Sequence, residues 1–112
     1  MGKLRSFFTH KVYKEKHLFL YQMELQEEKL SRAISASSRR DILRLLADQK
    51  LTVKEIAQKT GQSVSLASRH LKMLHDLGFL HLEKKFPNKF YSLKIKELNE
   101  LLLIYDKVIT RL

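Results

Sequence analysis

The chain has 112 residues, of which 44% are hydrophobic, so it is long enough for one small domain with a modest core. It has three glycines, one proline and no cysteine, which excludes a disulfide scaffold, a thiolate metal site and a catalytic thiol. The formal charge of +10 is high for this length and indicates a polyanionic partner.

The positive charge is unevenly placed along the chain. Residues 60–96 contain seven basic and two acidic residues, whereas residues 97–112 contain two basic and three acidic ones. The excess of positive charge thus lies beside the proposed reading helix and is missing from the last helix. The alternative is a solvated basic surface that only aids solubility. No apolar run approaches the roughly 18 residues of a membrane span, and the N-terminus lacks the pattern of a secretory signal. We therefore expect a cytoplasmic protein with no membrane partner.

Residues 1–16 combine five basic residues with three aromatic ones and show no clear period. We predict that they form a basic N-terminal tail or arm ahead of a domain at residues 17–112. Such an arm can follow a phosphate backbone or enter a minor groove, and the alternative is that its aromatic rings pack on the core or on a second subunit. A helix on a membrane surface is disfavoured because Lys11 interrupts the apolar face.

Two helices are predicted next. From His17 to Ser35 the apolar residues, including Phe19 and Met23, fall on one stripe of a first helix. Ser38 and Asp41 then have capping-box spacing for a second helix, Arg39–Ala47. Its leucines and isoleucine cover most of the circumference, so we expect this second helix to be central. Leu51 is expected in a short extended piece.

The stretch from Thr52 to Leu77 predicts two helices joined by a tight turn. Thr52 and Glu55 form a capping box, Gly61 suits the left-handed end of the short helix, and Ser63 caps the next one. Along that next helix the inward positions are Ala67, Leu71 and Leu74, and the outward positions are Val64, Ser65, Ser68, Arg69 and Lys72. A short, polar and basic outer face is typical of a helix that enters the major groove of DNA.

A β-hairpin follows Gly78, which is expected in a left-handed conformation. Its strands are Phe79–Lys85 and Lys89–Leu93, with the turn at Pro87 and Asn88. Lysines 84, 85 and 89 gather at the tip, where they can meet the phosphate backbone. The alternative is an ordinary hairpin whose lysines protect an exposed strand edge.

The final helix, Lys96–Leu112, carries a broad apolar face that a small domain does not easily cover. We interpret this face as half of a homodimer interface shared with the first helix, and packing within one chain is the alternative. The candidate interface residues are Phe19, Met23, Leu98, Leu101, Leu102, Tyr105, Val108 and Ile109. The fold class is therefore mainly α with a small β-hairpin: a winged helix-turn-helix whose first and last helices form the dimer.

The region from Ser38 to Leu93 resembles the winged helix-turn-helix of ArsR-type repressors. The resemblance rests on RRDILRLLADQKLTVKEIAQKTG, on SVSLASRHLKMLHDLGFL and on the FYSL of the second wing strand. It implies a dimer, a recognition helix in each major groove of a pseudo-palindromic operator, and repression by occupying a promoter. It also implies that Ser65, Ser68, Arg69 and His70 face DNA, whereas Val64 departs from the polar residue common there. The full set of candidate DNA-binding residues is Ser63, Ser65, Ser68, Arg69, His70, Lys72, Lys84, Lys85 and Lys89.

Many members of that family sense metals, but these residues do not favour a metal site. There is no cysteine, and the last helix has no histidine to share with a carboxylate. His75 and His81 are the pair that could approach one another, and lone imidazoles near a hairpin are usually surface residues. We therefore expect no metal and no cofactor.

The sequence also argues against an enzyme, because it has no phosphate-binding glycine loop and no nucleophile turn. We predict a transcriptional regulator that binds double-stranded DNA at specific sequences and acts as a repressor. The alternative is a winged-helix module that binds protein or RNA within a larger assembly.

Overall fold

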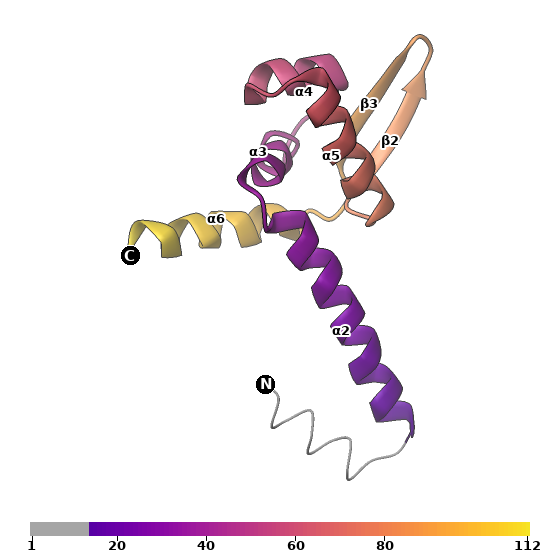
Figure 1. Ribbon diagram of the computed structural model, residues 1–112, viewed down its shortest axis with the longest axis vertical. Helices are drawn as coiled ribbons and strands as arrows, with labels where there is room; N and C mark the ends of the chain where they lie inside the picture. The colour runs from indigo at the N-terminus through magenta and orange to yellow at the C-terminus, as the bar shows by residue number, and fades with distance from the viewer. Residues whose placement is uncertain (1–13) are drawn as a thin grey trace. The chain divides into compact units, whose positions relative to one another are not determined.

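The computed structural model describes residues 14–112 (Figure 1), with side chains described from residue 17 onward. The chain divides into two compact units, residues 1–32 and residues 33–112. Most of the predicted basic arm lies outside the described residues, so its role stays a prediction.

The first described element is the long helix α2 (Lys14–Ile34), which begins three residues before the predicted start. Its apolar side chains are largely exposed, including Phe19 at 59% and Met23 at 45%. Three further exposed apolar residues follow helical spacing on another side of the helix, namely Leu18, Tyr21 and Leu25. Helix α2 therefore presents two apolar stripes.

Helix α3 (Ser37–Leu45) begins earlier than predicted, and the expected cap is wrong. The residue at the N-cap is Ala36, which makes no side-chain capping bond. Ser38 lies inside the first turn, and its hydroxyl Oγ is 3.0 Å from Nε2 of His70 instead. The central position of this helix is confirmed, because Ile42, Leu43 and the adjacent Leu46 are completely buried.

The helix-turn-helix forms as predicted. Helix α4 (Val53–Thr60) starts with the complete capping box, in which the Glu55 amide donates to Thr52 Oγ1 over 3.3 Å and the Thr52 amide donates to Glu55 Oε1 over 3.0 Å. Gly61 ends it with a φ of 69°, a left-handed conformation that favours glycine. Helix α5 (Val64–Asp76) is capped by Ser63, whose Oγ accepts from the Leu66 amide over 3.1 Å.

A three-stranded antiparallel sheet forms the wing and its base. Strands β2 (Leu80–Lys85) and β3 (Asn88–Leu93) make the hairpin, and the two-residue strand β1 (Leu51–Thr52) pairs with the other edge of β3. Gly78, with a φ of 94°, turns the chain from α5 into the hairpin, as predicted. Asn88 was predicted in the turn but pairs with Lys85, which leaves Phe86 and Pro87 as the turn. The hairpin lies beside α5, and its turn extends away from the helices (Figure 1).

The last helix, α6 (Glu97–Thr110), packs on α3. Leu98 and Leu102, which were predicted in the dimer interface, are 3% and 1% exposed and lie in the core of the chain itself. They join the fully buried residues of the other elements, which include Ile42, Leu43, Leu46, Ile56, Leu71 and Leu74. Among the described residues, no helix is both long and apolar enough to cross a bilayer.

Candidate nucleic-acid interface

Helix α5 has one buried side and one polar, exposed side. Ala67, Leu71 and Leu74 are completely buried and fix the rotation of the helix about its axis. The opposite side is exposed and consists of Ser63, Val64, Ser65, Ser68, Arg69 and Lys72. Sequence reasoning placed these residues correctly because the 3.6-residue period needs no knowledge of the tertiary structure.

The two cations on this face differ in their surroundings. Lys72 Nζ lies 2.9 Å from Asp76 Oδ2, and this ion pair lowers the pKa of the Asp76 carboxyl. Both side chains are more than half exposed, so water screens the pair and its strength is small. Arg69, by contrast, has no carboxylate partner among the described residues. Its guanidinium is free to bind an incoming acceptor.

His70 does not share the exposed position of its neighbours. The ring is half-buried and contacts the first turn of α3 through the Ser38 hydroxyl, 3.0 Å away. Burial, together with the nearby charges of Arg39 and Arg69, lowers the pKa of His70 and so favours the neutral ring. The structure therefore places His70 as a contact between α5 and α3.

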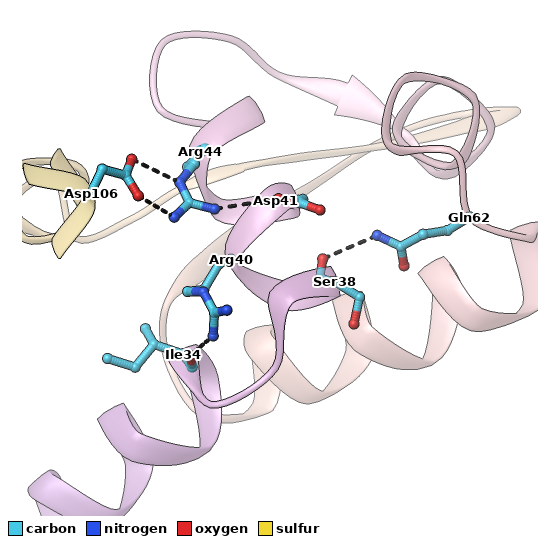
Figure 2. A network of polar contacts seen from close by, with 7 residues as sticks. All are labelled: Ile34, Ser38, Arg40, Asp41, Arg44, Gln62 and Asp106. Carbon is cyan, nitrogen blue, oxygen red and sulfur yellow. Dashed lines mark hydrogen bonds and ion pairs between the residues drawn. The ribbon is translucent and has the colours of Figure 1, made fainter. Parts of the chain in front are cut away.

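The turn of the helix-turn-helix is anchored to the same place. Gln62 donates from Nε2 to the backbone carbonyl oxygen of Ser38 over 3.0 Å, as Figure 2 shows. The Oε1 atom of Gln62 is buried and accepts no hydrogen bond from any described residue. Ser38, in the first turn of α3, thus anchors the loop between α4 and α5 through Gln62 and anchors α5 itself through His70.

The three lysines of the wing are not equivalent. The register sets Lys84 directly opposite Lys89, and Lys85 opposite Asn88, so Lys84 and Lys89 share one face of the ribbon. Like charges in directly opposite positions destabilise a ribbon, and neither lysine has a carboxylate partner among the residues described. A bound anion would relieve that repulsion.

Lys85 points to the other face, where it meets an acid. Its Nζ is 3.3 Å from Glu83 Oε1, while Lys50 Nζ is 2.9 Å from Glu83 Oε2. Both cations lower the pKa of Glu83, and the hydrogen bond from Lys50 is the largest cause. Part of the charge of Lys85 is therefore neutralised within the chain. Sequence reasoning missed Lys50, because it lies 33 residues from Glu83.

A polar network joins α3 to α6 (Figure 2). Arg44 donates to both carboxylate oxygens of Asp106, over 2.6 Å and 3.3 Å, and to Asp41 over 3.3 Å. The Arg40 guanidinium lies 5.1 Å from the centre of the Tyr105 ring and donates to the carbonyl oxygen of Ile34 over 2.7 Å. These contacts fix the direction in which α6 leaves the winged helix-turn-helix.

The apolar face of α6 is divided into two. Its buried side packs on the core through Leu98 and Leu102, and a second, exposed stripe follows the spacing of Leu101, Ile104 and Val108. Ile109 is 50% exposed near the end of the helix, and Tyr105 is half-buried. Sequence reasoning missed Ile104, which is 58% exposed and three residues from Leu101, because the predicted face was centred on Leu98, Leu102 and Tyr105 and did not include it.

Among the described side chains, residues 17–112, no group of three or more histidine, cysteine, aspartate or glutamate residues is arranged to hold a metal ion. His75 lies 3.8 Å from Asp76, and this pair is exposed.

Comparison with known proteins identifies the class. Residues 36–81 match the sequence model of the bacterial regulatory protein family arsR. HlyU from Vibrio cholerae is similar at 26% identity and a TM-score of 0.67, over 76% of this chain and 92% of that one. The homodimeric winged helix-turn-helix DNA-binding domain Mb0332 from Mycobacterium bovis is 23% identical, with a TM-score of 0.71 over 89% of each chain. The transcriptional repressor BigR from Xylella fastidiosa is 18% identical, with a TM-score of 0.70, over 87% of this chain and 96% of that one.

The order of the helices and strands, with the exposed basic helix α5, defines a winged helix-turn-helix fold. Over the helix-turn-helix and the start of the wing, residues 36–81, the chain is thus similar to bacterial regulatory proteins of the arsR family, and the similar solved structures have the same winged helix-turn-helix fold.

Proposed function

We propose that the protein is a homodimeric repressor that occupies a pseudo-palindromic operator. It would act in the cytoplasm, where that DNA lies. Helix α5 of each protomer reads a major groove, and each wing holds the adjacent phosphates. The observation that carries this proposal is the exposed row Ser65, Ser68, Arg69 and Lys72, held in place by a fully buried opposite side. The name of the similar protein BigR, a transcriptional repressor, supports the direction of regulation.

The residues divide into base-reading and backbone-binding groups. Arg69 is the base reader, because a free guanidinium forms two parallel hydrogen bonds to a guanine edge. Ser65 and Ser68 flank it and are small enough to let the helix backbone approach the groove. Ser63 and Lys72 lie at the two ends of the row and reach phosphates, as do the wing lysines. His70 supports the helix from behind rather than contacting a base.

The dimer interface uses the exposed stripes rather than the whole apolar face. On α6 these residues are Leu101, Ile104 and Val108, with Tyr105 and Ile109 at the margin. On α2 they are Phe19 and Met23. The homodimeric state of Mb0332, which has the same fold, supports this assignment.

We also propose that metal ions do not control this protein. The support is chemical: the chain has no thiolate ligand, and α6 has no histidine. Adding zinc should leave operator affinity unchanged, and a stoichiometric zinc site that shifts this affinity would contradict the proposal.

The test of the DNA-binding assignment compares two variants on two duplexes, a cognate site and a random sequence, over a range of salt concentrations. Arg69→Ala should cost about 1–3 kcal/mol on the cognate site and little on random DNA, because it removes a base contact. Replacing Lys84 and Lys89 with alanine should weaken both complexes equally and flatten the plot of log affinity against log salt by about one unit per lost contact.

Lys107→Ala serves as the control, because it removes one positive charge from the polar side of α6, away from α5 and the wing. It should change neither the specificity nor the salt dependence by a comparable amount. Equal losses on both duplexes for Arg69→Ala would contradict its role as base reader. Stronger binding to RNA than to any DNA duplex would favour the alternative of an RNA-binding module.

A further inference from the structure

Phe86 is the most exposed large apolar residue of the described chain. Its side chain is 100% exposed at the turn of the wing, and only the terminal Leu112, at 95%, comes near this value. The other exposed apolar side chains are 60% exposed or less. A single exposed apolar residue is ordinary on a protein surface, so its surroundings decide whether it has a use.

The surroundings of Phe86 are strongly basic. Lys85 precedes it directly, and the cross-strand pair Lys84 and Lys89 lies next along the ribbon. Glu83 is the one acidic residue within the hairpin, residues 80–93, and it lies on the face of Lys85. The tip of the wing is therefore a phenyl ring next to three lysines. Two of them, Lys84 and Lys89, have no carboxylate partner among the described residues.

The wing is long enough to present this tip to a groove. Each strand has six residues, which corresponds to about 20 Å at the rise of an extended chain. The hairpin lies beside α5, and its turn extends away from the helices (Figure 1). While α5 occupies a major groove, the tip can thus reach past the phosphates to the neighbouring minor groove.

We propose that Phe86 inserts into the minor groove of the operator as an apolar wedge between the two phosphate strands that the wing lysines hold. The inference rests on the proposed function and adds a mode of specificity to it. Duplex DNA offers anionic rims and an apolar interior of sugars and stacked bases, which matches a ring surrounded by lysines. A stable protein interface needs a much larger apolar area than one ring.

A wedge makes the sequence under the wing matter even without hydrogen bonds to its bases. Inserting a ring opens a base step and bends the duplex, and pyrimidine–purine steps resist this least. The operator should therefore prefer a flexible step at the position that the wing tip reaches.

The first experiment uses the absence of tryptophan from the chain, since Phe86→Trp places a single tryptophan at the tip, which can be excited selectively over the four tyrosines. On adding the cognate duplex, its fluorescence should be quenched by the bases and become protected from acrylamide. Phe90→Trp, four residues further along β3 and away from the tip, is the matched control and should respond much less. Equal responses at both positions, or no response at position 86, would overturn insertion of the tip.

The second experiment measures affinity and bending with unlabelled side chains. Phe86→Ala should lower cognate affinity about 5-fold or more, the loss typical of one base–aromatic contact, and should reduce the bend measured by energy transfer between labelled duplex ends. Because no charge is removed, the salt dependence should not change. Phe86→Leu should keep most of both effects, since leucine also acts as a wedge.

The outcomes separate this inference from the proposed function. If Phe86→Ala binds and bends DNA like the wild type while Arg69→Ala loses specificity, the wedge is wrong and the operator-binding role stands. If neither variant changes DNA binding, both fail. Circular dichroism of Phe86→Ala should match the wild type, because a fully exposed side chain contributes little to folding.

Discussion

Thr52 serves two elements at once. Its side chain caps α4, and its backbone pairs with Phe90 of the wing. Thr52→Ala should therefore lower the free energy of unfolding by about 1 kcal/mol, the usual cost of losing a cap. Thr52→Ser keeps the hydroxyl and is the control. Urea unfolding checks both, and an equal loss for the two variants would show that the capping bond is not the cause.

Glu55 adds a pH dependence to the same cap. Its hydrogen bonds to Thr52, first from the backbone amide and then from the side chain, lower the pKa of Glu55 below the ordinary value of 4.5. A lowered pKa in the folded state means that the carboxylate stabilises the fold above pH 4.5, and that this contribution is lost as the pH falls through the folded pKa.

Glu55→Gln keeps an acceptor oxygen but does not titrate. The stability advantage of the wild type over Glu55→Gln should thus shrink when unfolding is measured at successively lower pH below 4.5. A constant difference across this range would contradict the role of the charge.

Local signals could be predicted from the sequence, and long-range ones could not. The Thr52–Glu55 box, the Ser63 cap and Gly61 each involve residues within four positions, so the pattern contains all the partners. Ser38 and Asp41 have the same spacing as a capping box, yet the Ser38 hydroxyl contacts His70, which is 32 residues away. No local pattern includes that competing partner.

At the scale of elements, the two faces of the wing should respond differently to mutation. Glu83→Gln removes the acid that binds Lys50 and Lys85, so both cations become available to phosphates. Affinity for random DNA should rise and the salt dependence should steepen by about one unit for each cation that gains a phosphate contact. Glu97→Gln, which removes the same charge from the start of α6, is the control. Equal effects of the two variants would indicate only a change in net charge.

The ion pair between Arg44 and Asp106 should set the angle of α6. Asp106→Asn breaks it, and because the pair is half-exposed the loss of stability should be small, about 1 kcal/mol or less. The larger effect should be a changed preference for the spacing between operator half-sites, measured on duplexes lengthened or shortened by single base pairs. Asp41→Asn removes only the contact within α3 and is the control. An unchanged ranking of spacings would contradict this role of Asp106.

The broad face of α6 shows a limit of periodicity. Period alone places Leu98, Leu101 and Leu102 together, but it does not say which of them the core of the same chain buries. Contact with α3 decides this, and it takes Leu98 and Leu102 while leaving Leu101 exposed. The helical period predicts the direction in which a side chain leaves the helix axis. Which element that side chain contacts depends on the tertiary packing.

For the whole molecule, dimerisation and DNA binding should be lost together. Ile104→Glu and Leu101→Glu place a charge on the exposed stripe of α6 and should give monomers that lose operator affinity, because one half-site supplies only part of the contacts. Leu103→Glu makes the same change at a residue that is 55% exposed but off the stripe, so it should remain dimeric. Sedimentation at micromolar concentration distinguishes these outcomes, and a monomeric wild type would contradict the proposed interface.

The short third strand has a consequence for how this regulator can change. Strand β1 ends at the pairing of Thr52 with Phe90. Residues 84–89 therefore pair only with each other and with no strand outside the hairpin. Below that boundary, Tyr91 and Leu93 are buried and their substitution disturbs the fold. The segment 84–89 can therefore change in length and composition at little cost to folding. New target preferences can evolve there while the recognition helix stays the same.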